Sequence, residues 1–145
     1  MQLVICDDDP KDLKELERLL LKYKSFRSDA RFKIEKYSDT SALLNKIEKK
    51  ETADLYILDI IMSQMTGIDL GNEIRKINNK SILIYVTASD GFALDAYNVH
   101  AIRYLLKPIE ENKLFEALDY ALLHINDDKN SVYLVKTKEG LKSIL

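Results

Sequence analysis

Short apolar runs alternate with longer amphipathic segments along most of this chain, and four of the runs stop at polar residues suited to handling phosphate. The runs cover residues 4–6, 55–58, 82–86 and 104–106, and the polar residues that follow them are Asp7 with Asp8, Asp59, Thr87, and Lys107. If the runs are parallel strands of one sheet, their carboxyl ends share an edge, and open α/β sheets bind ligands outside that edge. The pattern therefore predicts three carboxylates, a hydroxyl and an ammonium at one small site.

The segments between the runs carry apolar residues at helical spacing. Asp9 is expected to cap a helix that starts at Pro10 and ends near Lys24, because proline at the first helical position loses no hydrogen bond. A less apolar strand is expected around residues 32–36, as is usual for a partly exposed sheet edge. Five strands that alternate with five helices indicate an α/β fold with a parallel sheet and helices on both faces. The remaining elements are expected as helices near 43–47, 68–77, 89–99 and 114–125, and as a strand near 102–106.

Composition narrows the class of protein. A chain of 145 residues with 46% apolar and 32% charged residues suits one compact globular domain with a short remainder. The net charge of −2 gives no reason to expect broad electrostatic binding to nucleic acid or to a membrane surface. The one cysteine, Cys6, lies inside an apolar run and is expected to be a buried core residue. With no disulfide within the chain and no apolar run of membrane-spanning length, the protein is predicted to be cytoplasmic.

The polar residues at the strand ends match the needs of a phosphoryl group and a hard cation. Mg²⁺ prefers oxygen ligands, and Asp7, Asp8 and Asp59 supply three carboxylates. An aspartate carboxylate is also able to attack phosphorus and form an aspartyl-phosphate. The Lys107 ammonium and the Thr87 hydroxyl would then bind the phosphoryl oxygens. A single aspartate after a strand is usually a cap or a turn residue, but these residues together at successive strand ends point to a site.

These residues carry a resemblance to a known family. Over residues 1–125 the chain strongly resembles the receiver domain of bacterial two-component response regulators. The resemblance implies a flavodoxin-like, doubly wound sheet of five parallel strands in the order 2-1-3-4-5, with five helices. The matching motifs are Asp7-Asp8 after the first strand, residues 58–62 around Asp59, residues 65–67, Thr87-Ala88, and residues 104–108.

The resemblance implies a role for each residue at the edge. Asp59 would accept a phosphoryl group from the phosphohistidine of a sensor histidine kinase. Asp8, Asp59 and the backbone carbonyl of Ile61 would bind Mg²⁺ directly, and Asp7 would act partly through water. Lys107 would bind the phosphoryl group. The chain would thus be a signalling phosphoacceptor that catalyses only its own phosphotransfer and dephosphorylation, and not an enzyme that acts on other substrates.

A conformational switch is also implied. Thr87 and Tyr104 would form the switch pair: Thr87 would move toward the phosphoryl group and leave space beneath the helix expected over 89–99, and Tyr104 would turn from outward to inward. The weak apolar stripe of that helix fits a mobile element. Its side chains, Tyr97 among them, would form part of a phosphorylation-dependent homodimer surface.

One position departs from the family pattern. The family usually has proline where Ser63 follows Met62. Serine lacks the fixed φ of proline and loosens the loop after the phosphorylation site, but it removes no ligand or catalytic group. We therefore expect altered loop dynamics and no loss of activity.

The composition changes after residue 125. Residues 126–131 are expected to form a linker, and residues 132–136 and 141–145 two short strands around a turn. This stretch resembles the opening of a LytTR-type DNA-binding domain, and the receiver motifs are similar to those of the LytR/AgrA-like subfamily. The chain is therefore predicted to be the receiver, residues 1–125, of a longer transcription regulator, with residues 126–145 as a linker and the start of a truncated output domain. DNA would be contacted only through that missing output domain.

Other functional classes fit the sequence less well. The main alternative is a receiver-like interaction domain that works without phosphorylation, and the intact aspartates, Thr87 and Lys107 argue against it. A phosphatase with an aspartyl-phosphate intermediate usually carries an acid or base two residues after the nucleophile, where this chain has the apolar Ile61. A nucleotide-binding domain would place a glycine-rich phosphate loop after the first strand, and none is present there.

Overall fold

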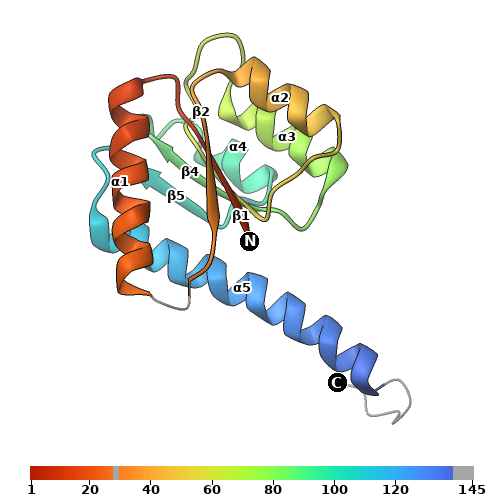
Figure 1. Cartoon of the computed structure of the whole chain (residues 1–145). Helices are drawn as coiled ribbons and strands as arrows, with labels where there is room; N and C mark the ends of the chain where they lie inside the picture. The colour runs from red at the N-terminus through yellow and green to blue at the C-terminus, as the bar shows by residue number, and fades with distance from the viewer. Residues whose placement is uncertain (28–29, 139–145) are drawn as a thin grey trace.

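Strands and helices alternate along the part of the chain that the computed structural model describes, residues 1–27 and 30–138 (Figure 1). Side-chain surroundings are described as far as Ile125. The strands are β1 (Gln2–Cys6), β2 (Lys33–Tyr37), β3 (Leu55–Leu58), β4 (Ile82–Thr87) and β5 (Arg103–Leu106). The helices are α1 (Pro10–Phe26), α2 (Thr40–Glu48), α3 (Gly67–Ile77), α4 (Ala93–Asn98) and α5 (Glu111–Lys138).

All neighbouring strands pair in parallel, in the order β2-β1-β3-β4-β5. The predicted doubly wound α/β fold and its strand order are therefore confirmed. β2 lies at an edge of the sheet and is only partly buried, whereas every residue of the central strand β3 is buried. This arrangement places the carboxyl ends of all the strands on one side of the molecule, where the polar strand ends must gather.

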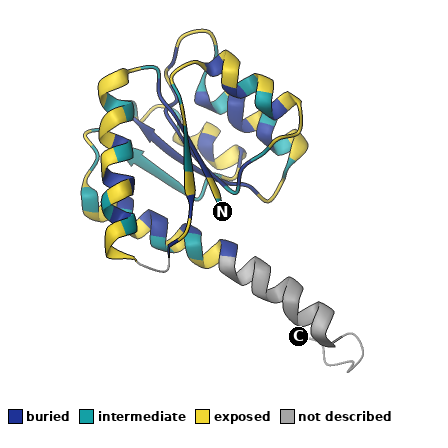
Figure 2. Cartoon of the chain, in the orientation of Figure 1, coloured by how far each residue is buried: buried dark blue, intermediate teal, exposed yellow. Residues whose placement is uncertain are grey.

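Alternate residues of each strand face opposite sides of the sheet, so each side has its own core. Leu3 and Ile5 of β1 pack with α1 and α5, whereas Val4 and Cys6 pack with α2, α3 and α4. The helices turn their buried positions toward the sheet and their exposed positions outward (Figure 2). Cys6 is a buried core residue as predicted, and burial raises the pKa of its thiol to about 12, which makes it a poor nucleophile.

Aspartates cap two helices, and the cap at Asp9 is the one that the sequence predicts. The Asp9 carboxylate accepts a hydrogen bond from the N–H of Lys11 (2.9 Å), with Pro10 in the first turn of α1. The Asp39 carboxylate accepts one from the N–H of Ser41 (2.8 Å) at the start of α2. No helix within the described residues is both long enough and apolar enough to cross a membrane.

Two helices differ in length from the sequence-based expectation. α4 covers Ala93–Asn98 where the sequence predicts 89–99, because a Ser-Asp-Gly turn precedes it. α5 continues to Lys138, so the backbone of residues 126–136 is helical where the sequence predicts a linker and a strand. A helix satisfies its backbone hydrogen bonds within the segment, whereas a strand needs a neighbouring strand to pair with. The second expected strand, residues 141–145, lies outside the described residues.

Candidate functional site

Backbone hydrogen bonds between neighbouring strands bring the polar strand ends together. The N–H of Asp59, after β3, donates to the carbonyl of Cys6 at the end of β1 (3.0 Å). The N–H of Lys107, after β5, donates to the carbonyl of Thr87 at the end of β4 (2.8 Å). The polar residues that the sequence pattern singles out therefore meet at one edge of the sheet, as predicted.

Three carboxylates form an acidic cluster at this edge. Asp7, Asp8 and Asp59 each contribute an oxygen that lies within 4.8 Å of the other two. Asp7 and Asp59 are buried, and Asp8 is partly exposed. Burial raises the pKa of Asp7, and its hydrogen bond to Lys107 only partly offsets this effect. Carboxylates this close repel one another, so the cluster favours positive charge between them.

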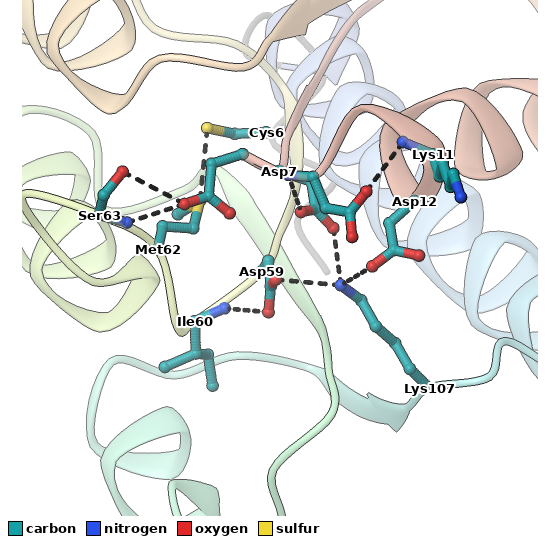
Figure 3. A network of polar contacts seen from close by, with 11 residues as sticks. Cys6, Asp7, Lys11, Asp12, Asp59, Ile60, Met62, Ser63 and Lys107 are labelled. Atoms are coloured by element: carbon teal, nitrogen blue, oxygen red, sulfur yellow. Dashed lines mark hydrogen bonds and ion pairs between the residues drawn. The ribbon is translucent and has the colours of Figure 1, made fainter.

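The ammonium of Lys107 reaches into the acidic cluster (Figure 3). Its Nζ lies 2.8 Å from Oδ2 of Asp7, 3.0 Å from Oδ2 of Asp59 and 2.7 Å from Oδ2 of Asp12. An ammonium has three N–H donors, so all of them are used by carboxylates. Burial disfavours the charged form of Lys107, but the hydrogen bonds to Asp12, Asp7 and Asp59 outweigh it and raise the pKa above its ordinary value. The lysine is therefore charged at neutral pH.

Asp12 is a member of this network that sequence reasoning misses. It lies in the first turn of α1 and is partly exposed. An acidic residue in the first turn of a helix is already explained by the positive end of the helix dipole, so its residue type calls for no second role such as the contact with Lys107. The available signal was its position: α1 starts just after β1 ends, so its first turn lies beside the same sheet edge as Asp7 and Asp8.

The Asp59 carboxylate and backbone are both held in place. Its Oδ1 accepts a hydrogen bond from the N–H of Ile60 (2.7 Å), and its Oδ2 contacts Lys107. Gly67, the first residue of α3, packs on the Asp59 carbonyl so closely that a Cβ there would lie 2.0 Å from the carbonyl oxygen. Only glycine permits this approach, so the start of α3 fixes the segment that carries Asp59.

Asp8 is held by the loop that follows β3. Its Oδ2 accepts hydrogen bonds from the N–H of Ser63 (2.8 Å) and from the Ser63 hydroxyl (3.3 Å). Sequence reasoning gives Ser63 no contact with the site, so this pairing is a further omission. Ile61, two residues after Asp59, has an exposed side chain and supplies no acid or base there.

The predicted switch pair lies on β4 and β5. Thr87 is fully buried, and its hydroxyl has no hydrogen-bond partner within the described residues. Buried hydroxyls nearly always have a partner, so a bound group is the natural candidate for this one. Tyr104 is partly buried; its hydroxyl donates to the carbonyl of Ser89 and accepts from the N–H of Phe92 (3.4 Å). Tyr104 is therefore tied to the loop between β4 and α4.

The fold and the acidic site agree with one known family. Residues 3–119 match the response regulator receiver domain, and the chain belongs to that family. Receiver domains are signalling phosphoacceptors rather than enzymes that act on other substrates, which agrees with the apolar residue at position 61. The acidic triad of Asp7, Asp8 and Asp59 is typical of the magnesium-binding site of receivers.

Comparison with individual proteins supports this assignment. The sensory transduction protein LytR of Staphylococcus saprophyticus is 34% identical over 118 residues, which are 81% of this chain and 44% of LytR. The chain thus spans less than half the length of this curated relative. The response regulatory domain of mrkE from Klebsiella pneumoniae superposes with a TM-score of 0.75 at 22% identity, over 85% of this chain and 96% of that one. Response regulator TrrA from Thermotoga maritima, solved with Mg²⁺ and BeF, gives 0.69 at 24% identity over 83% and 97%.

Proposed function

We propose that this chain is a phosphorylation-switched receiver that takes a phosphoryl group from a sensor histidine kinase onto Asp59 in a Mg²⁺-dependent reaction. The observation that carries the proposal is the arrangement around Asp59. Its buried carboxylate contacts a charged lysine and belongs to a cluster of three carboxylates within 4.8 Å of one another. Membership of the receiver family supports a histidine kinase as the donor.

The transfer is a displacement at phosphorus. A carboxylate oxygen of Asp59 attacks the phosphorus of the kinase phosphohistidine; an O–P bond forms as the N–P bond breaks, and the imidazole leaves with the electron pair. The N–H of Ile60 and the ammonium of Lys107 orient the carboxylate for this attack (2.7 and 3.0 Å). The ammonium then turns from the carboxylate to a phosphoryl oxygen, whose charge it neutralises.

The acidic cluster fits a divalent cation. The site holds four carboxylates, the three of the cluster and Asp12, and one ammonium, which contacts Asp7, Asp59 and Asp12, so it keeps a net negative charge. We assign Asp8, Asp59 and the Ile61 backbone carbonyl as direct Mg²⁺ ligands and Asp7 as a ligand partly through water. When bound, Mg²⁺ neutralises the carboxylates and the phosphoryl oxygens. The structurally similar TrrA, solved with Mg²⁺ and BeF, supports the choice of metal.

Thr87 and Tyr104 are the proposed switch pair. The Thr87 hydroxyl, buried and unpartnered among the described residues, donates to a phosphoryl oxygen. Its movement toward that oxygen leaves space into which Tyr104 turns. The turn breaks the contacts of the Tyr104 hydroxyl with Ser89 and Phe92, so the loop before α4 is released.

The output is proposed from the relatives. LytR of Staphylococcus saprophyticus is a sensory transduction protein of more than twice the matched length. We propose that residues 1–125 are the receiver and that residues 126–145 lead into a LytTR-type DNA-binding domain, through which alone the protein contacts DNA. Phosphorylation would promote a homodimer through a surface that includes α4 and its exposed Tyr97.

Acetyl phosphate with Mg²⁺ tests the proposed phosphotransfer. We expect the intact mass to rise by one phosphoryl group, EDTA to prevent the rise, and Asp59→Asn to take up none. Asp95→Asn, which removes an exposed carboxylate on α4, is the matched control and should be phosphorylated like the unaltered protein. If the unaltered protein gains no phosphoryl group, or if Asp59→Asn still gains one, the proposal fails.

A further inference from the structure

Both donors of Ser63 converge on one oxygen of a proposed metal ligand. The Ser63 N–H lies 2.8 Å and its hydroxyl 3.3 Å from Oδ2 of Asp8. Asp8 is partly exposed and, unlike Asp7 and Asp59, it has no contact with Lys107 within the described residues. Ser63 is therefore the residue that orients this carboxylate.

The loop that carries Ser63 is itself anchored. The Ser63 carbonyl accepts hydrogen bonds from the N–H of Met65 (2.9 Å) and from the hydroxyl of Thr40 in the first turn of α2 (3.4 Å). The next side chain, Gln64, accepts a hydrogen bond from the Ser41 hydroxyl (2.6 Å), and its backbone adopts a positive φ of 76°. Hydrogen bonds to α2 thus position the two donors that Ser63 presents to Asp8.

We propose that Ser63 is a positioning residue that holds Asp8 ready for Mg²⁺ and thereby sets the affinity of the acidic cluster for the cation. This inference rests on the proposed function, which makes Asp8 a direct ligand. An ionised carboxylate has two oxygens with about four lone-pair sites, so two donors on Oδ2 leave sites for a metal. A carboxylate already fixed in one orientation loses less conformational entropy when the metal binds. Loss of such hydrogen-bond partners typically weakens metal binding about 10–100-fold.

Ser63 supplies what a proline at this position cannot. Proline has no backbone N–H, so it would remove the shorter of the two hydrogen bonds together with the hydroxyl. Serine in place of the usual proline therefore lacks the rigid ring but provides two hydrogen-bond donors to Asp8.

Calorimetric titration of the whole, unphosphorylated chain with MgCl₂ tests the inference. Ser63→Pro, which loses both donors, should weaken Mg²⁺ binding about tenfold. Ser63→Ala, which keeps the N–H, should weaken it roughly threefold, and Ser63→Thr should retain the affinity because both donors remain. Ser25→Ala is the matched control: it removes an exposed serine hydroxyl that donates to the Lys22 carbonyl within α1 (2.7 Å) and has no part in holding Asp8, so the Mg²⁺ affinity of this variant should be unchanged.

The Mg²⁺ dependence of phosphorylation by acetyl phosphate distinguishes a positioning role of Ser63 from a merely structural one. In the Ser63 variants the Mg²⁺ concentration for half-maximal rate should rise by the same factor as Kd, while the rate at saturating Mg²⁺ stays within about twofold. Equal Mg²⁺ affinity in Ser63→Ala, Ser63→Pro and the unaltered protein overturns the inference and leaves the proposed function intact. If Ser63→Pro does not fold, the Mg²⁺ affinities of Ser63→Ala and Ser63→Thr are compared instead, and equal affinities of these two variants overturn the inference. An unaltered protein that neither binds Mg²⁺ nor takes up phosphate overturns the proposed function itself.

Discussion

Helices α3 and α4 pack on the same face of the sheet, beside the site, but they are held in different ways. α3 begins with a complete capping box: the Thr66 hydroxyl accepts from the N–H of Asp69, and the Asp69 carboxylate accepts from the N–H of Thr66, each at 3.1 Å. Its four buried residues are Gly67, Leu70, Gly71 and Ile74. Both its start and its inner face are therefore firmly docked.

α4 has much weaker attachments. It covers six residues, has no side-chain cap, and buries Ala96 alone of those six. Leu94 and Tyr97 are 72% and 74% exposed. The loop before it is held by the Tyr104 hydroxyl, and Arg75 donates to the two backbone carbonyls that follow it (2.8 and 3.2 Å).

The contrast separates two tasks. α3 keeps Asp59 in a fixed position, because Gly67 packs on the Asp59 carbonyl. α4 buries little apolar surface, so a small free energy is enough to move it. A chemical change at Asp59 should therefore move α4, while α3 stays in place.

The largest difference is expected between Gly67, the first residue of α3, and Gly91, which lies just before α4. In Gly67→Ala the new Cβ would lie 2.0 Å from a backbone oxygen, and we expect the free energy of unfolding to fall by about 3 kcal/mol. In Gly91→Ala the nearest atom is the Ser89 hydroxyl oxygen at 3.4 Å, and the change should stay within about 0.5 kcal/mol. Urea denaturation measures both, and similar losses in the two variants would contradict the comparison.

Leucines on the two helices give the next largest contrast. Leu70 of α3 is fully buried, so Leu70→Ala should cost about 3 kcal/mol of stability. Leu94 of α4 is mostly exposed, so Leu94→Ala should change stability by less than about 0.5 kcal/mol. Thermal or urea unfolding measures both changes in stability. A large loss of stability in Leu94→Ala would mean that α4 is docked more firmly than its contacts indicate.

The cap of α3 should have a moderate effect. Thr66→Ala removes the hydroxyl that accepts from the Asp69 N–H, and we expect a loss of about 1 kcal/mol in urea denaturation. Thr66→Ser keeps this hydroxyl and serves as the control, with a change of only a few tenths of a kcal/mol. Equal stability of the alanine and serine variants would show that the capping box does not hold α3.

The smallest and most local effect is expected at Tyr104. Tyr104→Phe loses the hydroxyl contacts with Ser89 and Phe92, worth about 1 kcal/mol. Amide hydrogen exchange should become roughly fivefold faster in α4 and stay unchanged in α3. Faster exchange in both helices would show that Tyr104 supports the whole face rather than the loop before α4.

Local pattern was enough to predict most elements of the fold. Strands β1 and β3 and helix α3 lie where apolar periodicity places them, because a buried strand or an amphipathic helix must show its period in the sequence. The course of α5 beyond Ile125 was not predictable in this way: a polar segment that later turns apolar fits a linker and a strand as well as it fits a helix. The structure has a helix there.

For the site too, one part was predictable from the sequence and another part was not. The sequence by itself determined that Asp7, Asp8, Asp59, Thr87 and Lys107 lie at the carboxyl ends of strands. Because the strands of one parallel sheet run in the same direction, these ends lie at a common edge. Tertiary structure alone decided which side chains complete each other across that edge. Lys107 takes Asp12 from α1 as a third partner, and Ser63 gives both its donors to Asp8. Hydrogen bonds form only within about 3.5 Å, and such distances between separate segments depend on how helices and loops pack against the finished sheet.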